Sequence, residues 1–449
     1  MFAQTHQRLR FALKHPFARH SAILQAAGII SKGVGILTGI LFANLLGPED
    51  YGLYTLATTL AAFLNVFQEF GMGHAIVNLL ARAEARSDRA EARDVLAYFL
   101  KTTVAIGATA GVAGMLAAPF LGERWYHDPM VGWYAALGVL TFALTFFVPL
   151  VTTLQQIRRE LIPLAVLETG SKIIGAVVTV AWVLLGGGVM AIIGGQFLLM
   201  VGASIAAAFI YRRYVRAGTA VGLSDLWRTR VPWPKISYYF RFGFLIAISK
   251  NILKVNQTVP LLMLGAVLPT TSGLGFFKVA FTYVGLPLVF ADPIARLLND
   301  QFPKTEVAGN SKLFKRFYQI TGLTLLMELV VLLPAILLAP VFINALFPAY
   351  GPALPFIMAL SPYPLLVAGG VGLAAMFRTL NRMRVNVAIQ VFTLLTLLPL
   401  SWYLINASAI RGLVIATLLF TFVPNFLGFA YFWWLRRRLV APPFPAVPA

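Results

Sequence analysis

Two lysines and a glutamine share one face of a long apolar segment in the second half of the chain. Lys250, Lys254 and Gln257 follow i, i+4, i+7 spacing, with Asn251 beside them, and the surrounding residues are mostly leucine, isoleucine and valine. Each lysine inside a membrane helix costs about 2.5 to 3.5 kcal/mol, and the two also repel each other. An anionic ligand would offset both costs, so this face is the leading candidate for substrate binding. The alternative is that the lysines extend to the membrane interface or pair with neighbouring acids.

Lys32 is the counterpart of these lysines in the first half of the chain. It shares a helical face with Gly28, Gly35 and Gly39, small residues that allow another helix or a bulky substrate to approach closely. Packing accounts for the glycines but not for the lysine. We therefore expect Lys32 to bind substrate rather than to extend to the interface.

Three further charges lie in apolar segments. Glu168 and Lys172 are spaced i, i+4, in the orientation that favours an ion pair within one helix. Glu69 accompanies Asn65 and Gln68 and would suit a coupling ion, a proton or a lysine partner. All three are candidates for ion coupling or ion pairing.

The sequence lacks the residue sets that covalent catalysis and ATP hydrolysis require. The chain has no cysteine and five histidines, and His74 has no second histidine or cysteine at metal-ligand spacing. No G-x-x-x-x-G-K-[ST] phosphate loop is present, so ATP hydrolysis is not expected of this chain. We expect no metal, no cofactor and no enzymatic activity.

The segments that position these residues are apolar enough to cross a membrane. The 449 residues are 59% hydrophobic and 12% charged, which is too little charge to cover a water-exposed surface. Apolar runs of about 20 residues, the length that crosses a bilayer, recur from end to end. They predict about twelve membrane helices, near residues 22–46, 52–80, 95–121, 131–154, 162–185, 189–211, 242–268, 273–297, 315–345, 353–377, 385–404 and 412–435.

The net charge of +20 reflects the distribution of basic residues among the predicted loops. One side of the predicted membrane domain holds nearly all of them, as in the loop from Arg82 to Arg93, whereas the other side holds only Arg124 and Arg411. The positive-inside rule then places both termini in the cytoplasm. The basicity reports topology and an attraction to anionic lipid, and no nucleic-acid partner is expected.

The chain divides near its middle into two related halves. Ile30-Ser31-Lys32 opens the first predicted helix and Ile248-Ser249-Lys250 lies early in the seventh. Each triplet precedes an apolar stretch, a polar turn and then Gly-Leu, at Gly52-Leu53 and at Gly273-Leu274. These matches predict a duplication. With an even number of helices in each half, the repeats are parallel and face each other across a central cavity.

The predicted organisation follows from this division. The longest polar interruption contains Pro232 and Pro234 and separates two lobes of six helices. We expect a basic N-terminus at 1–21, an N-lobe at 22–211, a cytoplasmic linker at 212–241, a C-lobe at 242–435 and a tail at 436–449.

A motif follows the first predicted helix. The segments Leu46-Gly47-Pro48-Glu49-Asp50-Tyr51-Gly52-Leu53-Tyr54 and Glu69-Phe70-Gly71-Met72-Gly73 resemble polysaccharide-type flippases of the multidrug/oligosaccharidyl-lipid/polysaccharide exporter superfamily. The residues of the first segment have a structural interpretation, since Gly47-Pro48 forms a turn and Tyr51 and Tyr54 suit a membrane interface. None of them is placed in the candidate site.

The resemblance implies an all-α polytopic protein of the bacterial inner membrane that translocates a polyprenyl-pyrophosphate-linked oligosaccharide for cell-surface polysaccharide biosynthesis. It implies alternating access through a cationic cavity, coupled to ions or to the membrane potential. Expected partners are the lipid-linked oligosaccharide, membrane lipids, and the polysaccharide polymerase and chain-length machinery.

Two alternatives remain open. A multidrug/cation antiporter of the same superfamily is expected to line its lobe with acids, so Lys32, Lys250 and Lys254 count against it. A membrane glycan polymerase or ligase is disfavoured because every predicted outer loop is short and the histidines form no recognisable catalytic cluster.

Overall fold

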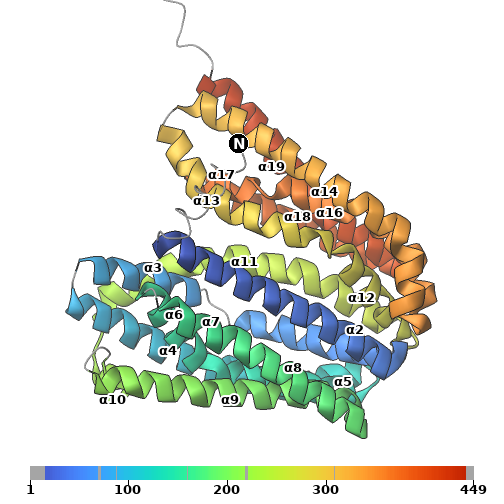
Figure 1. Cartoon of the computed structure of the whole chain (residues 1–449), viewed down its shortest axis with the longest axis horizontal. Helices are drawn as coiled ribbons and strands as arrows, with labels where there is room; N and C mark the ends of the chain where they lie inside the picture. The colour runs from blue at the N-terminus through green and yellow to red at the C-terminus, as the bar shows by residue number, and fades with distance from the viewer. Residues whose placement is uncertain are drawn as a thin grey trace, which may run out of the picture. The chain divides into compact units, whose positions relative to one another are not determined.

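The computed structural model describes residues 16–68, 72–86, 88–158, 160–217, 221–307 and 309–440. Within these ranges every regular element is helical and no strand occurs (Figure 1). The chain forms two compact units. The first comprises the residues up to Asp50 and Ala57–Lys250, and the second comprises Tyr51–Leu56 and the residues from Asn251 onward. The lobe and linker boundaries expected from the sequence stay a prediction.

The first unit is built almost entirely from helices, interrupted by the 3-10 turns η1 and η2 and the π turns η3 and η4. In chain order it contains α2 (Pro16–Leu64), η1 (Asn65–Phe67), α3 (Met72–Ala85), α4 (Arg89–Tyr126), α5 (Pro129–Ala143), η2 (Leu144–Phe146), α6 (Phe147–Ile157), α7 (Leu161–Ala165), η3 (Val166–Gly170), α8 (Ser171–Trp182), η4 (Val183–Gly187), α9 (Gly188–Arg216), α10 (Leu223–Arg228) and the first part of α11 (Trp233–Val267).

Small residues allow α4 and α5 to pack closely. A Cβ added to Gly122 would lie 2.5 Å from the backbone nitrogen of Gly132, and one added to Gly132 would lie 2.5 Å from Cα of Pro119. Side chains larger than hydrogen would therefore force the two helices apart. The buried core of this unit lies at the other end of α4, where α3, α4, α6, α9, α10 and α11 contribute residues such as Leu80, Val95, Val151, Tyr211, Leu226 and Tyr239.

The second unit contains, besides Tyr51–Leu56 of α2 and the rest of α11, the elements α12 (Ser272–Val284), η5 (Pro287–Phe290), α13 (Ala291–Val307), α14 (Asn310–Leu346), η6 (Pro348–Ala353), α15 (Leu354–Leu360), α16 (Pro362–Gly370), α17 (Leu373–Thr379), α18 (Met383–Ser408) and α19 (Ile410–Val440). Aromatic rings pack together, edge to face or tilted, at one end of this unit. Phe317 contacts both Phe302 and Phe432, with ring centroids 6.3 and 6.0 Å apart, and Phe377 lies 4.5 Å from Phe432. Such pairs add packing energy beyond the apolar area that they bury.

The motif segment after the first predicted helix has a structural role. Gly47 adopts φ 74°, a left-handed conformation that favours glycine, and Pro48 follows it, so α2 breaks there. Tyr51 is buried against Tyr350, with ring centroids 6.2 Å apart, and its expected place at the membrane interface stays a prediction. A Cβ added to Gly52 would lie 1.8 Å from the Thr271 carbonyl oxygen. The Gly-Leu turn of the first half therefore contacts the segment just before its counterpart at Gly273.

The described residues confirm an all-helical membrane fold. Six helical stretches are long and apolar enough to cross a membrane, and up to eight if each of two bent helix pairs is one span. Two of the six contain glycine breaks, at Gly47 in α2 and at Gly186 and Gly188 between α8 and α9. The stretch with the Gly186 and Gly188 breaks accommodates the predicted helices 162–185 and 189–211. The stretch with the Gly47 break accommodates 22–46 and the beginning of 52–80, which continues in η1 and α3. Apart from residues 69–71, which lie outside the described residues, every predicted membrane helix has a helical counterpart.

Three of the predicted continuous helices are broken beside a proline, whereas 52–80 is interrupted by η1 and 162–185 by η3. The segment 273–297 is interrupted before Pro287, 353–377 bends by 46° at Pro362, and 131–154 bends by 40° one turn before Pro149. A proline lacks the backbone N–H and its ring clashes with the carbonyl four residues earlier, which accounts for the breaks.

Candidate functional site

Glu168 lies in an irregular turn of the first unit. The π turn η3 interrupts the helix formed by α7 and α8, and Glu168 is its third residue. Turns of this kind are rare and occur frequently at functional sites, because they rotate side chains out of the regular helical register. The Glu168 side chain is exposed.

Both η3 and the first residues of α8 contact α2. Lys172 Nζ donates a hydrogen bond to Ser31 Oγ at 2.7 Å, and Thr169 Oγ1 donates to the Ala27 carbonyl at 3.3 Å. Lys32, which is half-buried, follows Ser31 on α2. The structure therefore brings together the turns that carry three of the predicted site residues, Lys32, Glu168 and Lys172.

The predicted ion pair between Glu168 and Lys172 is not formed in the described structure, where Lys172 instead donates to Ser31. The reason lies in the π turn, since its wider i→i+5 pattern takes the i and i+4 side chains out of alignment. Both side chains are exposed rather than neutralised by each other.

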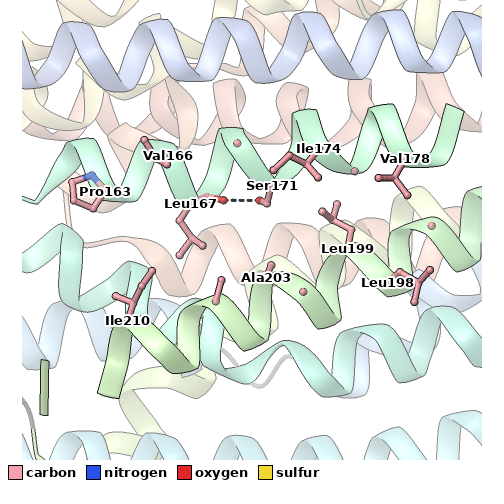
Figure 2. Close-up of a pocket in the computed structure, with 15 residues that line it drawn as sticks. Pro163, Val166, Leu167, Ser171, Ile174, Val178, Leu198, Leu199, Ala203 and Ile210 are labelled. Carbon is pink, nitrogen blue, oxygen red and sulfur yellow. Dashed lines mark hydrogen bonds between the residues drawn. The ribbon is translucent and has the colours of Figure 1, made fainter. Parts of the chain in front are cut away.

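An apolar cavity of about 660 Å³ is lined by other residues of the same segment, and none of Lys32, Glu168 and Lys172 lines it (Figure 2). It lies between η3 and α8 on one side and α9 on the other, and its lining includes Leu167, Ile174, Leu199 and Ala203. Ser171 also lines it, but the hydroxyl is occupied because it donates to the Leu167 carbonyl at 2.5 Å. The segment 163–178 therefore carries charges and lines an apolar cavity within a few turns.

The second group of predicted site residues lies on α11. Lys250 and Gln257 are exposed, while Asn251 and Lys254 are half-buried. The division between the two units falls between Lys250 and Asn251, in the middle of the helix. Thr258 Oγ1 donates to the Lys254 carbonyl at 2.8 Å. Their role in substrate binding stays a prediction.

Glu69 lies outside the described residues. Its neighbour Gln68 is buried and donates from Nε2 to Asn65 Oδ1 at 3.0 Å. The hypothesis that Glu69 binds a coupling ion stays a prediction.

Sequence reasoning missed Glu328. It lies midway along α14, is fully buried, and neither carboxylate oxygen has a hydrogen-bond partner among the described residues. A search of each apolar run for a single acid, here between Met327 and Leu329, would have found it. Buried ionisable groups in membrane helices are functional candidates by default.

A polar network near the start of α4 was also missed. Lys235 Nζ on α11 forms ion pairs with Glu91 Oε2 at 2.6 Å and Asp94 Oδ2 at 2.7 Å, and the Tyr239 hydroxyl donates to Glu91. Hydrogen bonds to Asp94 and Glu91 raise the pKa of Lys235 above its usual value. The ion pairs of Lys235 therefore link α11 to α4. Lys235 also belongs to the predicted basic loops.

Comparison with known sequences gives two matches. The model of a family described as "Polysaccharide biosynthesis protein" matches residues 17–298. Stage V sporulation protein B of Bacillus subtilis (strain 168) is 28% identical over 115 residues, which are 26% of this chain and 22% of that protein. The matched segment thus spans less than a quarter of that relative.

Comparison with solved structures identifies the fold. The inward-facing conformation of a multidrug resistance MATE family transporter of the MOP superfamily has a TM-score of 0.72 and 16% identity, covering 93% of this chain and 95% of that one. A MOP superfamily transporter from Pyrococcus furiosus Vc1 (DSM3638) has a TM-score of 0.62 and 18% identity, covering 94% and 96%. The expected polytopic, two-lobed helical fold is confirmed, and so is the resemblance found in the sequence.

Proposed function

This chain belongs to the polysaccharide biosynthesis protein family, and we propose that it translocates a polyprenyl-pyrophosphate-linked oligosaccharide across the bacterial inner membrane for cell-surface polysaccharide synthesis. The family and the fold both favour transport over catalysis. The substrate is released chemically unchanged, so no covalent step is required of the protein.

The observation that carries this proposal is the contact between two lysine-bearing turns of the first unit, next in sequence to residues that line an apolar cavity. Lys172 contacts the turn of α2 that bears Lys32, and the segment that begins α8 also lines the cavity of about 660 Å³. A pyrophosphate group is an anion that lysine ammonium groups bind well, particularly where water is scarce. Hydrophobic side chains beside it suit the adjoining isoprenoid units.

The lysines of α11 extend the same chemistry. Lys250 and Lys254 would contact the pyrophosphate or acidic sugars, with Asn251 and Gln257 hydrogen-bonding to sugar hydroxyls. Alternating exposure of the bound headgroup to the two faces of the membrane would complete transport. Both termini are cytoplasmic in this proposal, and the polymerase and chain-length machinery receive the translocated oligosaccharide.

Coupling of transport to an ion gradient requires an ionisable group whose surroundings change as the protein alternates between its conformations. Glu328 is the best-placed acid in the second unit, since transporters hold coupling ions near the membrane midplane and it lies at the midpoint of α14. Glu168 and Glu69 are the candidates in the N-terminal half.

Multidrug or cation antiport is the second candidate function, because the solved relatives include a multidrug resistance MATE family transporter. The sign of the charge at the binding site distinguishes the two functions. In the Pyrococcus furiosus relative, reverse polarity of the binding pocket suggests a different function. Lys32, Lys172 and Lys254 favour an anionic substrate in this chain over a cationic drug.

Depletion of the protein tests the proposal directly. Lipid-linked oligosaccharide should accumulate on the cytoplasmic face of the inner membrane, and restoring the wild-type chain should clear it. Susceptibility to cationic drugs, measured in the same cells, should not change. A change in drug susceptibility with normal glycolipid distribution would favour the antiporter instead.

A further inference from the structure

A second, polar cavity of about 740 Å³ lies at one end of the first unit. Four segments meet there: the end of α3, the start of α4, the turn between α6 and α7, and the end of α9. The charged residues that line the cavity are four arginines and two glutamates, which leaves a formal charge of +2: Arg89, Arg93, Arg158, Arg213, Glu84 and Glu160.

In the first turns of α4, the basic and acidic side chains lie on two different faces of the helix. Arg89, Ala92, Arg93 and Leu96 line the cavity, and their i, i+3, i+4, i+7 spacing defines one face of the helix. The acids of these turns, Glu91 and Asp94, lie off that face and form ion pairs with Lys235. Glu91 and Asp94 are thus already engaged by another cation, while Asp88 caps the helix by accepting a hydrogen bond from the Glu91 backbone N–H.

One wall of the cavity is held in place by side-chain contacts. The Arg158 guanidinium lies over the Tyr214 ring, 4.9 Å from its centroid, and the Tyr214 hydroxyl donates to the Glu160 carboxylate. Stacking and hydrogen bonding fix the ring from both sides, so this wall needs little reorganisation when a ligand binds. Glu160, the half-buried acid of the cavity, already accepts this hydrogen bond.

The cavity lies where two membrane spans end. One candidate span begins at Arg89, and another ends at Arg216, three residues beyond Arg213. Span ends of this kind meet lipid headgroups, and arginine and tyrosine are suited to that depth. The positive-inside distribution predicts that this is the cytoplasmic leaflet, whose surface carries anionic lipid.

We propose that this cavity binds the phosphate-bearing headgroup of an anionic phospholipid, with Arg89, Arg93 and Arg213 contacting the phosphate. Leu96 and Leu154 line the same cavity and contact the first methylene groups of the acyl chains. The bound lipid bridges α4 and α9 and stabilises the first unit. The site is distinct from the η3 cluster and does not depend on the transported substrate.

The test compares two pairs of arginines in the purified full-length protein: Arg93 on α4 with Arg213 on α9, and Arg86, just after α3, with Arg212 on α9. Arg93→Gln with Arg213→Gln removes two cavity charges. Arg86→Gln with Arg212→Gln removes two exposed charges nearby that do not line the cavity. Phosphatidylglycerol, phosphatidylcholine and inorganic phosphate are each titrated in detergent, and affinity is measured from the shift in melting temperature.

Phosphatidylglycerol should stabilise the wild-type protein while phosphatidylcholine should not. At about 1 kcal/mol for each arginine near the membrane surface, the cavity variant should bind phosphatidylglycerol roughly 25-fold more weakly. The control variant should retain the wild-type affinity. Equal losses in both variants would overturn the proposal, because they would indicate diffuse surface charge. Stabilisation by inorganic phosphate at the same concentrations as phosphatidylglycerol would also overturn it, because the ligand would then be a free anion.

Discussion

The charged residues of the first and second units differ in their exposure and in their hydrogen-bond partners. In the first unit Glu168 and Lys172 are exposed at a π turn, and Lys172 reaches across to Ser31 on α2. In the second unit Glu328 is fully buried in the middle of a continuous helix, with no hydrogen-bond partner among the described residues. An exposed charge beside a cavity can contact a ligand directly. A buried ionisable group can reach a ligand or an ion only in conformations of the protein that expose it.

The largest effect is expected from reversing the charge of the buried acid. Glu328→Lys places a longer, cationic side chain where no space or partner is available, at a cost of about 2.5 to 3.5 kcal/mol for the charge alone. The amount of folded protein in membranes should fall several-fold, measured by quantitative immunoblotting and size-exclusion chromatography. Glu168→Lys, at the exposed position, is the matched control and should leave the amount unchanged.

Glu328→Gln sharpens the comparison further. The amide of glutamine has nearly the same shape as the carboxyl group, so the amount of folded protein should be close to that of the wild type. If Glu328 is the coupling residue, transport should lose its dependence on a proton gradient. Normal gradient dependence in this variant would assign Glu328 to packing only.

A glycine pair on α2 gives the next largest effect. Gly52→Ala forces Cβ towards the Thr271 carbonyl oxygen, at 1.8 Å before relaxation, so we expect a loss of about 1 to 3 kcal/mol in the free energy of unfolding. Gly28→Ala meets nothing within 4 Å and should be neutral or slightly stabilising. Thermal unfolding in detergent measures both. A stable Gly52→Ala protein would contradict the close contact between these turns.

The smallest effect is expected at the half-exposed network of the first unit. Lys235→Met should cost about 0.5 to 1 kcal/mol, and less at high salt, because exposed ion pairs are screened. Since the pKa of Lys235 is raised in the fold, its contribution should be complete below about pH 10.4, the ordinary lysine value, and should disappear as the pH rises further. Melting curves at pH 7 and above pH 10, with and without added salt, check the direction. A cost that did not change with salt would show that the loss comes from packing.

Local signals in the sequence predicted most of the fold. Apolar run lengths located the helices, and Gly47-Pro48 located the break in α2, because both depend on residues adjacent in the chain. Pro149, Pro287 and Pro362 carried the information for three of the broken helices, but hydropathy averages over such positions and so predicted continuous spans.

The candidate site could be predicted only in part. Lys32, Glu168 and Lys172 were identified by their unfavourable environment, yet regular i, i+4 spacing predicted an ion pair that the π turn prevents. The partners Asp94 and Lys235 are 141 residues apart, and no periodicity relates them. Burial of Tyr51 against Tyr350 likewise depends on tertiary packing that its motif does not encode.

The most direct test of the central claim is a charge series at Lys172 and Lys254, with lipid-linked oligosaccharide on the cytoplasmic face measured beside the level of the membrane protein. If these lysines contact an anionic headgroup, Arg should retain more transport than Ala, and Glu should be the most defective because it reverses the field at the site. Protein levels should remain close to that of the wild type. Wild-type translocation by a stably inserted Lys172→Glu, Lys254→Glu double variant would contradict the account.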